Sequence, residues 1–120
     1  MLRWPGYFVD PPNDTTSGDV NSRLRQFAAE RDWERYHDPK NLAMAVASEA
    51  GELLAELRWL TTEESRPDAL SAAQRQAISH EMADVLIFLL RMADVLEIDL
   101  PSATIEKIHI NESRFNRAES

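Results

Sequence analysis

The stretch that decides the fold is EMADVLIFLLRMADVL, residues 81–96. Its central VLIFLL segment is apolar on every side of a helical wheel, and it lies inside a longer helical pattern that reaches about Glu97. Ser71 opens this pattern, because Ser71 and Gln74 three residues later form a capping box. The resulting helix has about 27 residues and is about 40 Å long. A helix buried on every side in so small a protein indicates an interface between subunits.

Helical patterns also precede and follow this segment. Apolar residues recur at helical spacing over residues 19–37, and Asp38-Pro39 ends that pattern. Asp38 can cap a second helix over residues 39–60, with Pro39 at its first position. A loop over residues 61–70 follows, and Asp99-Leu100-Pro101 starts a fourth helix that runs toward the charged end of the chain. No stretch has the period of a strand, so the predicted fold class is all-α, a four-helix bundle-like domain.

Composition restricts the classes of protein and partner. A length of 120 residues favours one helical domain over residues 19–120, preceded by an irregular arm over the proline- and glycine-rich residues 1–18. The 21 acidic against 13 basic residues, a net charge of −8, argue against a nucleic-acid polymer as partner. The absence of cysteine excludes disulfides, zinc thiolates and iron–sulfur clusters. Neither a membrane-spanning run nor a signal-peptide pattern is present, so we expect a cytoplasmic protein without a membrane partner.

Two pairs of carboxylates border the apolar sectors of the second and third helices. Glu49 and Glu52 are three residues apart, with Glu56 continuing their stripe, and Glu81 and Asp84 repeat the spacing. If the two helices pack antiparallel, the two pairs converge where water is partly excluded, which is unfavourable for uncompensated charges. A divalent cation removes that penalty, and an all-oxygen donor set favours Mg²⁺, with Mn²⁺ as a substitute. The alternative is that each pair is a solvated face.

Several aromatic residues lie off the predicted core. Trp33 and His37 are four residues apart, on a side of their helix away from its apolar stripe. Trp59 shares the helical sector of Glu52, and an aromatic ring beside an acidic metal site can stack on a base. The alternative is that these side chains pack against other helices or the arm.

A polar stripe on the fourth helix is suited to phosphate. Lys107, Asn111 and Arg114 recur at positions i, i+4 and i+7, so they share one face. Two cations and an amide in a row match the hydrogen-bonding capacity of phosphate oxygens. Such a stripe can also be a solvated face.

The ordered motifs resemble those of a known family. EAGE at 49–52 and EMAD at 81–84 give E-x-x-E followed by E-x-x-D, the pattern of the MazG-like all-α nucleoside triphosphate pyrophosphohydrolases. FAAERDWERYHDPKNLAMAVASEAGEL, LRW, DVLIFLL and KIHINESR look like the dCTP pyrophosphatase branch of that family. The resemblance covers about residues 24–115. It departs at Phe88, where this branch often carries tyrosine.

The resemblance implies a function for each of these groups. It implies hydrolysis of a nucleoside triphosphate, dCTP or a modified pyrimidine nucleotide, to the monophosphate and pyrophosphate in a homodimer or homotetramer. The metal ligands for Mg²⁺ would be Glu49, Glu52, Glu81 and Asp84, and Glu49 or Glu52 would orient the attacking water. The phosphate chain would contact Lys107, Asn111 and Arg114, and the base would contact Trp33, His37, Trp59 and Phe88.

Two other interpretations are compatible with the residues. Glu34 with His37 and Glu106 with His109 both read E-x-x-H, the spacing of carboxylate-bridged di-iron bundles. A non-catalytic helical adaptor is the second interpretation, although such a protein is expected to lack a motif carboxylate and all four are present.

Overall fold

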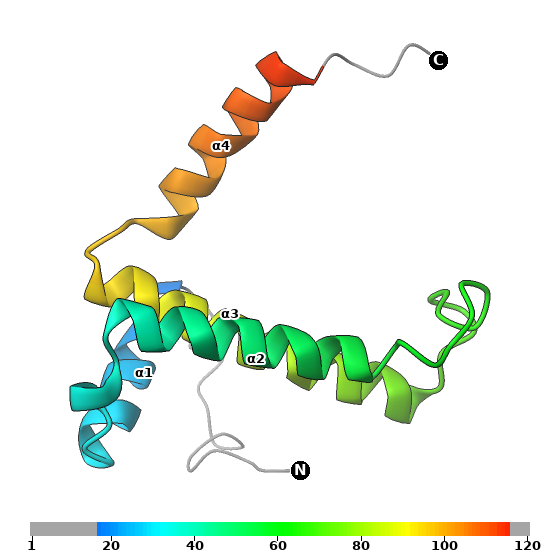
Figure 1. The fold of residues 1–120 in the computed structure, drawn as a ribbon, viewed down its shortest axis with the longest axis horizontal. Helices are drawn as coiled ribbons and strands as arrows, with labels where there is room; N and C mark the ends of the chain where they lie inside the picture. The colour runs from blue at the N-terminus through cyan, green and yellow to red at the C-terminus, as the bar shows by residue number, and fades with distance from the viewer. Residues whose placement is uncertain (1–16, 116–120) are drawn as a thin grey trace.

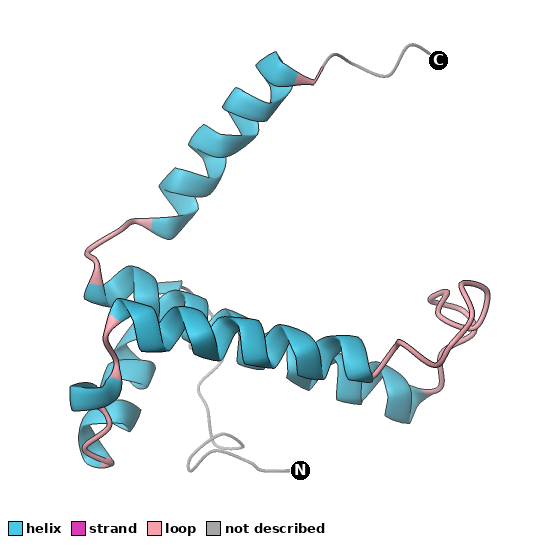
Figure 2. Cartoon of the chain, in the orientation of Figure 1, coloured by secondary structure: helices cyan, strands magenta, loops and turns pink. Residues whose placement is uncertain are grey.

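The structure is a computed structural model that describes residues 17–115. Its elements are α1 (Ser17–Glu30), the short 3-10 helix η2 (Glu34–Tyr36), α2 (Pro39–Ala55), α3 (Ala72–Val95) and α4 (Leu100–Arg114). Helices and loops account for all of the described residues, which confirms the all-α prediction (Figure 2). The predicted arm over residues 1–18 lies outside the described residues except for its last two, which begin α1.

The helices α2 and α3 form an antiparallel hairpin, and the other helices are arranged around one of its ends. The N-terminus of α2 and the C-terminus of α3 lie at the same end, where α1 packs against α3 (Figure 1). The helix α4 leaves this end and projects away from the hairpin (Figure 1). Side chains of α2 and α3 that face each other in this hairpin can therefore form a common site.

The predicted helix starts are confirmed by their caps. The side chain of Asp38 accepts the backbone N–H three residues later, with Pro39 at the first position of α2. Ser71 and Gln74 exchange the two hydrogen bonds of a capping box, of 3.0 and 2.8 Å. Asp99 caps α4 in the same manner as Asp38. Each cap satisfies N–H groups that the first turn of a helix leaves unpaired.

The first helix is shorter than predicted, because it ends at Glu30 and does not continue to residue 37. Asp32 has a left-handed backbone with φ 55°. The N–H of Trp33 donates to the carbonyl of Ala28 at 2.9 Å, and the N–H of Asp32 donates to that of Ala29 at 3.1 Å. These two bonds are a Schellman motif, which usually places glycine at the left-handed residue. With aspartate there, the sequence carried no stop signal.

The third helix ends in the same motif at the predicted place. The N–H of Ile98 donates to the carbonyl of Ala93 at 2.8 Å, and Glu97 is left-handed with φ 56°. Glu97 therefore sets the direction in which the chain leaves the hairpin toward α4. A non-glycine residue in this conformation is strained by about 1–2 kcal/mol.

The second helix ends at Ala55, earlier than the predicted residue 60. Glu56 is its C-cap, and turn hydrogen bonds of the i to i−3 type, such as Leu57 N–H to Leu54 carbonyl at 2.9 Å, replace the helical ladder. Turns and bends then continue through residues 61–70, as predicted for that loop. Trp59 consequently lies beyond the helix on which it was predicted.

The core lies at one end of the hairpin. Its buried apolar side chains come from α1, α2 and α3, and they are Leu24, Ala28, Leu42, Leu90 and Ala93. Within one chain α3 is not covered on every side, because Leu86 is 49% exposed, so the predicted interface between subunits stays a prediction. Packing by α1 and α2 covers only part of its circumference. Within the described residues, no helix has both the length and the hydropathy of a transmembrane segment.

Candidate metal and nucleotide site

Three of the four predicted carboxylates meet in the hairpin. Glu49 comes from α2, and Glu81 and Asp84 come from α3. One oxygen of each lies within 4.8 Å of the other two, and all three side chains are half-buried. The antiparallel packing of α2 and α3 produces this arrangement, because it brings the middle of one helix against the middle of the other. Three carboxylate oxygens at this spacing fit a hard divalent cation such as Mg²⁺.

Burial and mutual repulsion both act on the carboxylates of the group. Burial raises the pKa of Glu49 above its ordinary value, and the charges of Asp84, Glu81 and Glu52 raise it further. Burial likewise raises the pKa of Glu81, with the charges of Asp84, Glu52 and Glu56 acting in the same direction. Like charges disfavour one another's ionised forms in this way when no cation compensates them.

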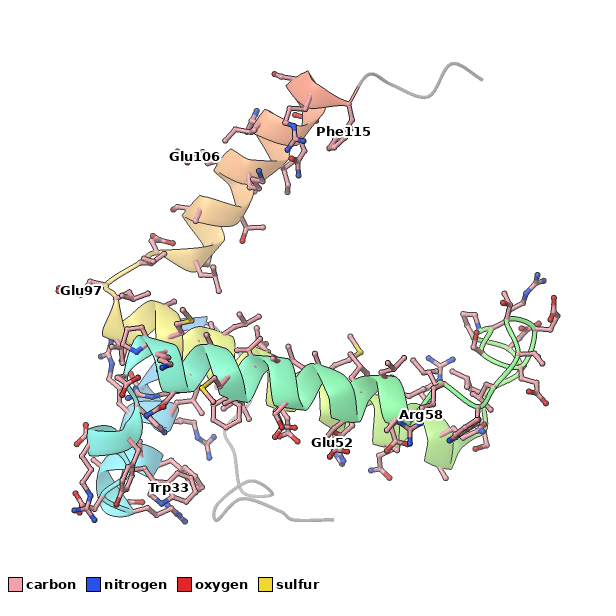
Figure 3. All side chains as sticks on the ribbon, in the orientation of Figure 1. Trp33, Glu52, Arg58, Glu97, Glu106 and Phe115 are labelled. Atoms are coloured by element: carbon pink, nitrogen blue, oxygen red, sulfur yellow. The ribbon has the colours of Figure 1, made fainter. Side chains whose placement is uncertain are left out.

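Glu52 is beside the group but not within it. Its side chain is exposed, and it contributes no ligand atom to the cluster of Glu49, Glu81 and Asp84. Its charge nevertheless acts on both Glu49 and Glu81. Figure 3 shows Glu52 on the hairpin itself, well away from α4.

Trp33 and His37 are not on a common helix, because α1 ends before both of them. Trp33 is the N-cap of η2 and His37 is its C-cap. The Trp33 ring packs edge-on against Phe27, with ring centroids 5.5 Å apart and planes at 78°, and remains partly exposed. The two side chains therefore flank η2 at the core end of the hairpin, as a pair held by a turn rather than by a helix.

Trp59 and Phe88, the two other aromatic residues predicted to contact the base, differ in exposure. Trp59 is 83% exposed in the turns after α2, with the guanidinium of Arg58 5.3 Å from its ring centroid. Phe88 is half-buried on α3, two helical turns beyond Glu81 and on the same face. Phe88 thus shares a helix face with Glu81, whereas the Trp59 ring is largely exposed.

The predicted phosphate residues are not brought to the carboxylates within one chain. Lys107, Asn111 and Arg114 share a face of α4, and the first two line a shallow surface groove of about 390 Å³ along that helix. The projecting helix carries this face away from the hairpin (Figure 1). Neither cation is among the charges that act on the pKa of Glu49 or of Glu81.

A buried polar network was missed by the sequence reading. Arg91 is 6% exposed and donates from Nη1 to Asp94 at 3.1 Å and from Nε to Nδ1 of His37 at 3.3 Å. Arg25 on α1 binds the same Asp94 carboxylate with two hydrogen bonds, of 2.8 and 2.5 Å. The sequence does contain a signal for this network, because Arg91 directly follows the apolar VLIFLL segment and stands three residues before Asp94.

Neither E-x-x-H pair joins a metal-binding group within the described residues. His37 uses Nδ1 to accept the Arg91 hydrogen bond, and His109 is 3.7 Å from Glu112 on the exposed helix α4. The cluster that does form contains carboxylates alone, which fits Mg²⁺ better than the mixed carboxylate and imidazole set of a di-iron bundle.

Comparison with known proteins relates the chain to pyrophosphatases. It is 40% identical over 111 residues to dCTP pyrophosphatase 1 of Homo sapiens and 39% identical over 110 residues to that of Rattus norvegicus. Each match covers 92% of this chain, which spans 65% and 64% of the length of these two relatives. The crystal structure of a pyrophosphatase from Archaeoglobus fulgidus superposes with a TM-score of 0.76 and 34% identity, over 83% of this chain and 92% of that one. No family model matches.

Proposed function

Because this chain belongs to the MazG-like family of all-α pyrophosphatases, we propose that it is a Mg²⁺-dependent nucleoside triphosphate pyrophosphohydrolase. The proposed substrate is dCTP or a modified pyrimidine nucleotide, and the proposed products are the monophosphate and pyrophosphate. The name of the mammalian relatives supports the choice of base.

The observation that carries the proposal is the convergence of Glu49, Glu81 and Asp84. Their oxygens lie within 4.8 Å of one another, and burial together with mutual repulsion raises the pKa of both glutamates. A protein that holds three carboxylates in this way without a cation loses stability by doing so. Use of a bound cation in catalysis would explain why the three carboxylates are held together despite this loss of stability.

In the proposed site, Glu49, Glu81 and Asp84 hold the metal ion and the adjacent Glu52 completes the set. Mg²⁺, when bound, supplies positive charge that neutralises the charge developing on the pyrophosphate leaving group. Glu52, which is exposed beside the cluster, or Glu49 orients the water that cleaves the bond between the α and β phosphates. One water molecule is consumed for each monophosphate and pyrophosphate released.

We propose that a second copy of the chain completes the site, in a homodimer or a homotetramer. Four apolar side chains are 48–61% exposed in the single chain: Leu86 of α3, Ile105 and Ile108 of α4, and Phe115, the C-cap of α4. Exposed apolar side chains at this density on helices mark association surfaces. The same association would bring Lys107, Asn111 and Arg114 of one copy to the carboxylates of the other and place the base against Trp33, His37, Trp59 and Phe88.

The proposed activity is tested by product analysis. A panel of canonical and modified nucleoside triphosphates is incubated with the protein and Mg²⁺, and the products are separated by anion-exchange chromatography. We expect the monophosphate and pyrophosphate in equal amounts, with pyrimidine deoxynucleotides consumed fastest. Release of diphosphate and orthophosphate, or no turnover of any nucleotide, would contradict the proposal, and absence of turnover would favour the adaptor.

The contribution of the second copy is tested by mixing two inactive variants. Glu81→Gln removes the metal half of a site and Arg114→Ala removes the phosphate half, so a mixed dimer keeps one site in which both halves are intact. After unfolding and refolding an equimolar mixture, we expect about a quarter of the wild-type activity to return. Mixtures that stay as inactive as their components would show that both halves come from the same chain.

A further inference from the structure

A chain of four polar side chains connects α1, α3 and the segment before α2. Arg25 of α1 binds both oxygens of Asp94, Asp94 also accepts from Nη1 of Arg91, and Nε of Arg91 donates to Nδ1 of His37. Arg91 is the innermost member, with a side chain only 7% exposed. Its two hydrogen bonds use separate parts of the guanidinium, so it contacts Asp94 and His37 at the same time.

The chemistry of arginine fixes the protonation of His37. A guanidinium has five N–H donors and no acceptor, and it does not lose its proton in proteins. The imidazole nitrogen that meets Arg91 must therefore carry a lone pair, and in a neutral imidazole the single proton is then on Nε2. Within residues 17–115, Nε2 has no hydrogen-bond partner, so its N–H is available to a bound molecule.

We infer that Arg91 is a positioning residue that holds His37 as the Nε2–H tautomer, so that His37 offers a hydrogen-bond donor to an acceptor on the nucleobase. The acceptor belongs to the class of carbonyl oxygens and unprotonated ring nitrogens. This inference rests on the proposed function, because it assigns the orientation of one of the residues proposed there to contact the base. It identifies Arg91 as a determinant of base recognition although Arg91 is too buried to touch the nucleotide itself.

The surroundings of His37 agree with a neutral imidazole. Burial lowers the pKa of His37, and the positive charge of Arg91 lowers it further, against a smaller opposing effect of Glu34 on η2. The residue is also held in place, because its backbone N–H donates to the carbonyl of Glu34 at 3.1 Å while Arg91 donates to its ring at 3.3 Å. A donor that is locked in both tautomer and place discriminates between acceptor and donor groups on a base more sharply than a ring free to exchange its proton.

The tautomer is tested directly by nuclear magnetic resonance. Long-range ¹H–¹⁵N correlation spectra of ¹⁵N-histidine-labelled protein at neutral pH distinguish a protonated ring nitrogen from one with a lone pair. We expect Nδ1 of His37 to carry the lone pair in the wild type and in Arg25→Met, the matched control, which cuts the network on the far side of Asp94. In Arg91→Met the ring should become a mixture of tautomers with a higher pKa.

The effect on base recognition is tested by a double-mutant cycle. Gln at position 37 presents an amide N–H close to the place of Nε2 but needs no partner to choose a tautomer. We expect Arg91→Met to raise KM for the nucleotide about five- to tenfold at nearly unchanged kcat, the size of one neutral hydrogen bond. In the His37→Gln background the same change should raise KM less than twofold, and Arg91→Lys, which keeps a charged donor, should restore part of the wild-type value.

The outcomes separate the inference from the proposed function. A wild-type His37 with its lone pair on Nε2, or an unchanged tautomer in Arg91→Met, overturns the inference whatever the activity. An equal rise in KM in both backgrounds also overturns it, because Arg91 would then act through the fold alone. Absence of turnover in every variant and in the wild type refutes the proposed function, while the tautomer assignment is still decided by the spectra.

Discussion

The hairpin of α2 and α3 and the projecting helix α4 are both amphipathic, but only the hairpin finds its partner within the chain. In the hairpin Leu42 is 1% exposed and the carboxylates Glu49 and Glu81 are drawn together across the two helices. In α4 no residue is buried, and its apolar side chains Ile105 and Ile108 are 57% and 48% exposed. The comparison teaches that the metal half of the proposed site is intramolecular and that the phosphate half depends on what covers α4.

The largest expected effect concerns the carboxylates of the hairpin. We predict that Glu52→Gln and Glu81→Gln each lower kcat about a thousandfold or more, because the cation stabilises transition-state charge by several kcal/mol and each 1.4 kcal/mol is about tenfold. Steady-state kinetics measure the loss, and circular dichroism should show a fully helical protein. Glu63→Gln, the same charge change in the exposed loop after α2, is the control and should retain activity. Near-normal rates in both site variants would refute the metal site.

A second prediction compares the stability of the two regions. Leu42→Ala should lower the free energy of unfolding by about 2–5 kcal/mol, because it empties a fully buried position. Ile105→Ala, at a 57% exposed position of α4, should cost about 0.5 kcal/mol or less in the dissociated chain. Urea denaturation over a range of protein concentrations measures both.

The concentration dependence in that experiment tests the comparison itself. If a second copy covers α4, the wild-type midpoint rises with protein concentration, and Ile105→Ala reduces the rise. A wild-type midpoint that is independent of concentration would leave α4 without an intermolecular partner, and the proposed assembly would be wrong.

The third prediction uses the raised pKa values of Glu49 and Glu81. A carboxyl whose pKa is raised by folding contributes stability that is present below its ordinary value of 4.5 and is lost as pH rises through the raised pKa. Without metal, Glu49→Gln should therefore melt at a higher temperature than the wild type at pH 7.5, by a few degrees, with a smaller difference at pH 4.5. Adding Mg²⁺ at pH 7.5 should stabilise the wild type more than the variant.

The comparison with a variant is needed because His37 acts in the opposite direction. Folding lowers the pKa of His37, so its contribution to stability is present above its ordinary value of 6.5 and is lost as pH falls. The difference in melting temperature between wild type and Glu49→Gln removes this shared effect. Equal melting temperatures at both pH values, with and without Mg²⁺, would contradict repulsion within the cluster.

The smallest expected effect concerns the connection between the two regions. Glu97 has φ 56°, a left-handed conformation that glycine adopts without strain. Glu97→Gly should raise the free energy of unfolding by about 0.5–1 kcal/mol after the larger entropy of the unfolded glycine chain is subtracted. Glu97→Ala is the control, since it removes the charge and keeps the strain, and it should give no gain in thermal or urea denaturation.

The parts of the fold that the sequence predicted are those with a local chemical signal. The starts of α2, α3 and α4 were predicted because Asp38, Ser71 and Asp99 are side chains that cap helices. The end of α1 was not, because a Schellman motif with Asp32 in place of glycine leaves no trace in a residue pattern. The predicted pairing of Trp33 and His37 on one helix was wrong for that reason.

In the candidate site, too, the features set by local sequence pattern could be predicted and those set by packing between distant segments could not. Helical spacing and antiparallel packing predicted that four carboxylates converge, and Glu49, Glu81 and Asp84 do so, whereas Glu52 stays beside the cluster. The position of α4 relative to the carboxylates depends on packing between distant segments or chains, which spacing does not encode. The hydrogen bond from Arg91 to His37 joins residues 54 positions apart and required the structure for the same reason.

The left-handed residue Glu97 lies between α3 and α4, so the angle between the hairpin and α4 depends on the backbone at this position. A helix of 15 residues is about 22 Å long, so a rotation of about 10° at this position displaces its tip by about 4 Å. Arg114 sits at that tip, whereas the carboxylates stay where they are. Small changes of angle at one backbone position can thus change how far Arg114, a proposed phosphate-binding residue, lies from the carboxylates proposed to hold the ion, without moving those carboxylates.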